Sequence, residues 1–164
     1  MHTILSVLIV LLFTCGQQQA PAVGMGELFT LAEAEKILGE PATLGNNTEG
    51  FDGQSGFHNI DYVAKDTDRV SGKHGAIYLL MQSYKTAAGA QERYATIKTA
   101  NERAGIETLT DVGDEAYFHS DNENFLFIMA RKGVKVLTMK VNKVTSKTSV
   151  DAFNEVARKI VAKM

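Results

Sequence analysis

The amino-acid sequence predicts an α+β fold, in which a single, mostly antiparallel sheet of about five strands has helices packed on one face. Segments with the caps and apolar spacing of helices alternate with short strand-like segments, in the order α-β-β-α-β-β-β-α. Most neighbouring strand segments are joined by turns too short for a crossover helix, and such strands pair antiparallel. Helices packed on one face of the sheet are the natural arrangement for this element order.

The first helix is expected over residues 29–39, with a signal at each end. Thr30 and Glu33 have the spacing of a capping box, in which each side chain bonds the backbone N–H of the other residue. Gly39 occupies the position after the helix, and Pro41 lies just beyond it. The buried stripe is expected to consist of Leu31, Ala34, Ile37 and Leu38.

An exposed loop and two strands are expected next. Residues 42–56 are rich in Gly, Asn and Thr, which is typical of a loop. Apolar and polar side chains alternate over 58–65, as in a half-buried strand. A charged turn over 66–75 precedes residues 76–84, which are apolar on both faces and predict a central strand.

Two further helices are expected in the rest of the chain. One begins at Thr86, runs to about Ala104 and ends at Gly105, with only a thin apolar stripe. The other follows a cap at Thr148 or Ser149. Its inward side chains are expected to be Val150, Phe153, Val156, Ala157, Ile160 and Val161.

Strand-like segments fill the chain between these two helices, at 107–110, 115–119, 125–131 and 134–142. The turn at Lys132-Gly133 gives the strongest hairpin signal, because Gly accommodates a positive φ. Five lysines cluster near this hairpin: Lys132, Lys135, Lys140, Lys143 and Lys147. We interpret them as protection of an edge hairpin against aggregation, rather than as a surface for anionic lipid or a partner.

The N-terminal residues have the pattern of an export signal. The apolar run at 4–13 is broken only by Ser6 and is shorter than the roughly 20 residues that a membrane-spanning helix needs. It fits the apolar region of a secretory signal. The only cysteine, Cys15, ends this run in Leu12-Phe13-Thr14-Cys15-Gly16, which resembles the lipobox of bacterial lipoproteins. The resemblance implies cleavage between Thr14 and Cys15 and acylation of the Cys15 thiol.

The same resemblance divides the chain into a lipoprotein signal peptide over 1–14, a tether over 15–27 and a single α+β domain over 28–164. Two or more acyl chains, such as palmitate, anchor a protein stably because each buried methylene contributes about 0.8 kcal/mol. The expected location is the bacterial cell envelope, and the outer membrane if the source is Gram-negative. The alternatives are a signal peptide cleaved after Ala20 or Ala22 and an anchor that is never cleaved.

A second resemblance rests on motifs within the domain. Leu31–Pro41, the turn Val112-Gly113-Asp114-Glu115-Ala116-Tyr117, the hairpin Arg131-Lys132-Gly133 and the terminal helix follow one another. In this order they resemble a group of small uncharacterised bacterial lipoproteins and, more distantly, PsbP-like and kinase-sensor-like extracytoplasmic domains. The resemblance covers most of 28–162 and implies a fold and a location. Its motifs are structural, so it implies no active-site residue.

Several candidate sites have weak patterns. His58, His74 and His119, with Asp61 as a fourth ligand, lack the local spacing of a zinc motif, so scattered surface histidines are the better interpretation. Ser55 lacks the flanking pattern of a nucleophile elbow. The acidic stretch lacks the ligand order of an EF-hand and predicts solvated turns; it consists of Asp111, Asp114, Glu115, Asp121 and Glu123.

We therefore expect a membrane-anchored, non-catalytic binding or accessory module, with its binding surface on the open sheet face or the 42–56 loop. The net charge of −2 argues against nucleic acid as a partner, and no cofactor is expected. A protein or small-molecule partner in the envelope is expected instead. One alternative is a small hydrolase, which needs two of the three histidines close to each other or to a carboxylate in a cleft. The other is a purely structural lipoprotein.

Overall fold

The computed structural model describes residues 28–102 and 105–164. Thr14, Cys15 and the expected signal peptide and tether lie outside this part of the chain. The strands are β1 (Ala42–Phe51), β2 (Ser55–Ala64), β3 (Ala76–Tyr84), β4 (Glu107–Thr108), β5 (Glu115–Ser120), β6 (Phe125–Lys132) and β7 (Lys135–Asn142). The helices are α2 (Leu31–Leu38), α3 (Ala87–Glu102) and α4 (Val150–Lys163). The predicted α+β class is confirmed.

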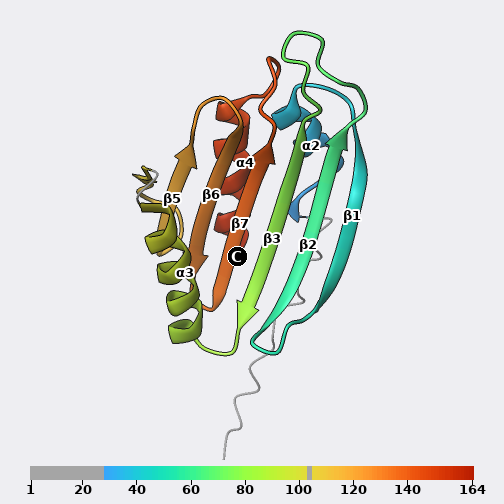
Figure 1. Ribbon diagram of the computed structural model, residues 1–164. Coiled ribbons are helices and arrows are strands. Elements are labelled where there is room, and N and C mark those ends of the chain that lie inside the picture. The colour runs from blue at the N-terminus through green and yellow to red at the C-terminus, as the bar shows by residue number, and fades with distance from the viewer. Residues whose placement is uncertain (1–27, 103–104) are drawn as a thin grey trace, which may run out of the picture.

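All seven strands belong to one antiparallel sheet, in the order β1-β2-β3-β7-β6-β5-β4. The first three strands form a meander, and α3 then leads the chain to the opposite edge of the sheet (Figure 1). Four strands return from that edge towards the centre, where β7 pairs with β3. The final strand therefore joins the two parts of the sheet.

Apolar side chains cover both faces of the sheet. On one face, Ile77, Leu79 and Leu137 are buried in the main core together with side chains of α2 and α4. On the other face, Met129 and Val136 pack with Ala90 and Tyr94 of α3 and with Tyr117. Figure 1 shows α3 on the near side of the sheet and α4 on the far side. The expectation that all helices pack on one face is wrong, because β6 alternates buried side chains between both faces and each face needs a cover.

The sheet has seven strands rather than the expected five. β1 was not expected, whereas the two-residue β4 lies within the strand-like segment expected at 107–110. Residues 42–56, expected to be a loop, form β1 and the beginning of β2. The pairing runs from Ala42 opposite Ala64 to Phe51 opposite Gly56, with an irregularity between Leu44 and Asn46. The Gly-, Asn- and Thr-rich sequence is tolerated here because nearly all of β1 is exposed at the sheet edge.

The helix ends agree with the sequence. The Thr30 side chain accepts from the Glu33 N–H, and the Glu33 carboxylate accepts from the Thr30 N–H, so the capping box is confirmed. Gly39 has a φ of +73°, and a Cβ there would lie 2.2 Å from the Lys147 carbonyl oxygen. Ser149 caps α4 by accepting from Ala152 N–H at 3.1 Å. At position 39, the positive φ and the lack of space for a Cβ atom both require glycine.

The lysine-rich hairpin does not lie at an edge. β7 pairs with both β3 and β6, so the expected edge protection by these lysines is wrong. Lys132 instead donates to the carbonyls of Val161 and Ala162 at the end of α4, and Lys147 pairs with Glu40 at 2.8 Å. Among the described helices, none combines the length and apolar character needed to cross a bilayer.

Candidate functional site

A hollow of about 440 Å³ lies at the end of the sheet where β3 leads into α3 and where β1 turns into β2. We call it the α3 groove. Its wall residues come from three places: the β1–β2 turn, the β3–α3 corner and one face of α3. They are Gly53, Gln54, Tyr84, Lys85, Thr86, Gly89, Glu92, Arg93 and Thr96. The turn belongs to the 42–56 segment, one of the two surfaces that the sequence suggested for binding.

The β1–β2 turn is held in place by its own side chains. Asp52 accepts from the N–H groups of Gln54 and Ser55 at 2.9 and 2.7 Å. These backbone hydrogen bonds, with that from Ser55 the strongest, hold the pKa of Asp52 below its usual value. The buried Gln82 of β3 donates to the Ser55 hydroxyl at 3.2 Å. This wall of the groove is therefore fixed to the sheet.

The opposite wall is the N-terminal half of α3. Its groove residues 89, 92, 93 and 96 have the spacing of one helical face. The Thr86 hydroxyl accepts from the Gly89 N–H at 3.1 Å and begins the helix. The Tyr84 N–H donates to the Val134 carbonyl at 2.9 Å and fixes the corner between β3 and α3. The helix face, the corner and the turn thus form the walls of one open hollow.

The charge in the α3 groove is positive. Lys85 and Arg93 contribute two cations, Glu92 contributes one carboxylate, and neither cation forms an ion pair with any described residue. The Lys85 ammonium lies 5.9 Å from the ring centroid of the exposed Phe51. An anionic group entering the groove would therefore meet two cations and one carboxylate, a net charge of +1.

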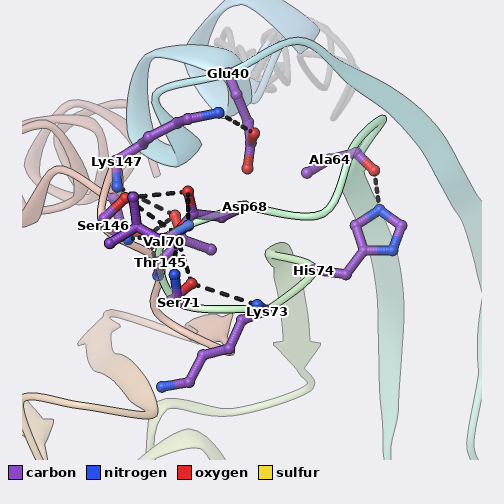
Figure 2. Close-up of polar contacts among 11 residues, drawn as sticks. Glu40, Ala64, Asp68, Val70, Ser71, Lys73, His74, Thr145, Ser146 and Lys147 are labelled. Atoms are coloured by element: carbon purple, nitrogen blue, oxygen red, sulfur yellow. Dashed lines mark hydrogen bonds and ion pairs between the residues drawn. The ribbon is translucent and has the colours of Figure 1, made fainter.

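A second hollow, of about 490 Å³, lies at the other end of the sheet between the β2–β3 loop and the segment before α4. The buried Asp68 is one of its lining residues, and Figure 2 shows the polar contacts of Asp68. The Asp68 carboxylate accepts from the N–H and hydroxyl of Ser71 and from those of Ser146, at 2.6 to 3.1 Å. The Ser71 hydroxyl is the largest of the causes that hold the pKa of Asp68 well below its usual value.

Because these hydrogen bonds use the Asp68 carboxylate fully, we interpret this cluster as a structural link between two loops. Glu40 and Lys147 lie beside it (Figure 2). Their hydrogen bond raises the pKa of Lys147. The second oxygen of the buried Glu40 carboxylate, Oε1, has no hydrogen-bond partner among the described residues. The link connects residues 68 and 146, which are far apart in the sequence.

The three candidate histidines do not come together. His58 lies on β2 and His119 on β5, and the three strands between them imply a separation of about 19 Å. His58 contacts the Asn47 side chain at 2.6 Å and lies 3.8 Å from a Glu49 carboxylate oxygen. His74 bonds the Ala64 carbonyl, and His119 bonds the Gly105 carbonyl at 2.5 Å.

The other candidate ligands are also separate. Asp61 and His58 are three residues apart on one strand, so their side chains lie on opposite faces of the sheet. Burial raises the pKa of Asp61. Asp121 accepts from three backbone N–H groups of its own turn, and Asp114 and Glu115 pair with Arg131. Over the described ranges, no group of three His, Cys, Asp or Glu residues is placed to hold a metal ion.

Sequence reasoning missed Lys85 and Arg93. The two cations are eight residues apart and belong to no motif, so no pattern brought them together. The available signal was the helical spacing of Gly89, Arg93 and Thr96, which places a polar face on a helix that has a thin apolar stripe.

Comparisons with known proteins concern the fold. No family model and no curated protein matches the sequence. The structure is similar to the extracellular domain of PknH from Mycobacterium tuberculosis, with a TM-score of 0.57 and 11% sequence identity. The similarity covers 83% of this chain and 91% of that domain. At this level of identity, the two proteins share a fold.

Proposed function

We propose that this protein is an extracytoplasmic binding module, held in the cell envelope by lipid on Cys15, and that it binds an anionic small molecule in the α3 groove without catalysis. The observation that carries the proposal is the groove itself. Two walls fixed by hydrogen bonds present Lys85 and Arg93, which have no ionic partner among the described residues. Pre-formed hollows with a few placed polar groups are typical of ligand sites.

Two further observations support the proposed location. The sequence ends its only early apolar run at Cys15, where lipoprotein processing requires a thiol. The similar PknH domain is extracellular, and a shared fold is compatible with a shared location. The lipid would then keep the domain at a membrane surface while the groove remains open to solutes.

The anchor is tested by expressing the full chain in a bacterial host and measuring the intact mass of the mature protein. We expect an N-terminus at Cys15, with the added mass of diacylglycerol and an acyl chain. The Cys15→Ser variant should keep its first fourteen residues and carry no lipid. A mature parent protein that begins elsewhere, or that carries no lipid, contradicts the proposed anchor.

The groove is tested separately, with inorganic phosphate and citrate as probe anions and NMR shifts or calorimetry as the readout. We expect the double variant K85A/R93A to weaken anion binding at least fivefold, because one unit of charge near the surface contributes about 1 kcal/mol. Lys98→Ala is the matched control, because Lys98 lies on α3 outside the groove and pairs with Glu102. Equal loss in both variants would indicate non-specific charge and contradict a site in the groove.

A further inference from the structure

The β1 edge of the sheet differs from the other edge. β1 has ten residues, of which nine are exposed, and it ends one side of the sheet (Figure 1). The opposite edge is the two-residue β4. Natural edge strands are commonly short, or carry Lys or Pro, because an open row of backbone groups pairs with other chains. β1 contains neither Lys nor Pro, and Glu49 is its only charged residue.

The backbone groups on the open side of β1 can be identified from the hairpin. The Asp52 N–H donates to the Ser55 carbonyl at 3.1 Å, so Asp52 faces β2. The backbone N–H and C=O groups of successive residues point to alternate sides of a strand. Those of Asn47, Glu49 and Phe51 therefore face away from β2. No described residue accepts a hydrogen bond from these three N–H groups. Towards the other end, the outward N–H of Ala42 is occupied by the Glu35 carboxylate at 3.1 Å.

We propose that β1 pairs antiparallel with β1 of a second copy of this chain, with Thr48 opposite Thr48 of the other copy. In such a pair of strands, the residues whose backbone groups point outward must lie opposite one another and form the hydrogen bonds between the two copies. This condition leaves three registers near the middle of β1. One places Glu49 opposite Glu49, and like charges directly opposite are destabilising. Another places Glu49 opposite Gly45, where the irregularity of β1 disrupts the ladder. The third pairs Asn47 with Glu49 and centres on Thr48.

The side chains favour this third register. The Asn47 Oδ1 atom already contacts His58 at 2.6 Å, so its amide nitrogen remains free to donate. In the proposed pair, that nitrogen faces the Glu49 carboxylate of the other copy, twice by symmetry. Thr48 lies on the other face of β1, and a Thr–Thr pair across two strands is favourable. The same patch is thus complementary to itself, which argues for a second copy as the occupant.

Disulfide trapping in the bacterial envelope tests the pairing and its register. The two Thr48 residues form a non-hydrogen-bonded pair, with a Cα separation of about 4.5 Å that a disulfide can span. We expect full-length T48C to form disulfide dimers under mild oxidation at least tenfold faster than V70C, whose position is 82% exposed in a distant loop. The parent chain measures any cross-link through Cys15. Trapping of T48C no faster than V70C or the parent overturns the proposal.

The Glu49→Cys variant tests the register. In the proposed pair the two copies of residue 49 are diagonal, with a Cα separation beyond the roughly 7 Å limit for a disulfide. E49C should therefore be trapped much more slowly than T48C. Equal or faster trapping of E49C contradicts the proposed register.

A proline at an outward position tests the hydrogen bonding. Pro removes the N–H of residue 49 but no bond to β2, and edge strands tolerate it. We expect E49P to reduce T48C trapping at least fivefold while thermal unfolding stays close to that of the matched E49A control. Unchanged trapping in E49P contradicts strand pairing. These outcomes do not depend on anion binding or on the identity of the anchor.

Discussion

On one face of the sheet, α2 and α4 bury a continuous layer of side chains, whereas on the other face α3 contributes only Ala90 and Tyr94 as buried residues. α4 is shorter than α3, yet six of its residues are buried. The two faces of the sheet therefore differ in how closely helices cover them. The α2 and α4 face buries most of the core side chains, and the α3 groove lies beside the less covered face.

The largest expected effect comes from the α4 face. Phe153 is fully buried and packs edge-on against Phe118, with ring centroids 6.5 Å apart. Phe153→Ala should lower the free energy of unfolding by about 4 kcal/mol, because the aromatic side chain is lost and a cavity remains. Urea unfolding at 25 °C measures this loss. The exposed Val150→Ala on the same helix is the control and should change it by less than about 0.5 kcal/mol.

A smaller effect is expected on the α3 face. Tyr94 packs edge-on against Tyr117 at 5.8 Å. Tyr94→Ala should lower the free energy of unfolding by about 2 kcal/mol, because a weakly held helix can move to fill the space. Hydrogen exchange should show faster opening of α3 in the variant, with little change in α4. If Tyr94→Ala costs as much as Phe153→Ala, the proposed difference between the faces is wrong.

The Asp68 link gives the α4 face a dependence on pH. Hydrogen bonds hold the folded pKa of Asp68 below the unfolded value of about 3.9, so the unfolded chain binds more protons in acid. This contribution to stability is present above about pH 5 and is lost as the pH falls towards the folded pKa. Asp68→Asn should lower the Tm by roughly 5 °C at pH 7.

The pH series contains its own control. Because the wild type loses the Asp68 contribution in acid and the variant has none to lose, the Tm difference between them should narrow between pH 5 and pH 2.5. A difference that stays constant or widens contradicts the role assigned to Asp68. Thermal unfolding followed by circular dichroism measures both proteins under the same conditions.

The smallest effect is expected at the surface between α2 and α4. Lys36 and Glu155 form an ion pair at 2.7 Å, but both side chains are more than half exposed. Lys36→Ala should change the free energy of unfolding by less than about 0.5 kcal/mol, because water and salt screen exposed pairs. A loss above 1 kcal/mol would show that packing between these two helices depends on this contact.

The sequence predicted elements whose signals are local. The caps at Thr30, Gly39 and Ser149 and the turn at Gly133 follow from neighbouring residues, and all are confirmed. β1 was missed because an edge strand exposed to solvent lacks the alternation that indicates a half-buried strand. The prediction that α3 packs on the same face of the sheet as the other helices was also wrong, because a thin apolar stripe does not indicate which face of the sheet the helix contacts.

The candidate site was harder to predict than the fold. The 42–56 segment, one of the two surfaces that the sequence suggested for binding, contributes Gly53 and Gln54 to the groove, and it does so only because α3 lies beside its turn. Lys85 and Arg93 become neighbours of Gln54 through the sheet topology, which no local pattern specifies. The three histidines show the reverse case, in which residues that suggest a site are kept apart by the fold. They are chemically suggestive in the sequence, yet β3, β7 and β6 separate His58 from His119.

The position of β7 has a consequence for how the chain reaches its native state. Residues 135–142 are the last strand to be synthesised, yet they join β3 to β6 at the centre of the sheet. Until they arrive, the inner side of β3 has no partner and the first meander has two open sides. The native sheet therefore cannot form until residues 135–142 are available, and the high share of distant pairings should make this step slow. A chain that stops before residue 135 lacks the strand that pairs with both β3 and β6, so the β1–β3 meander and the β4–β6 strands cannot form one sheet.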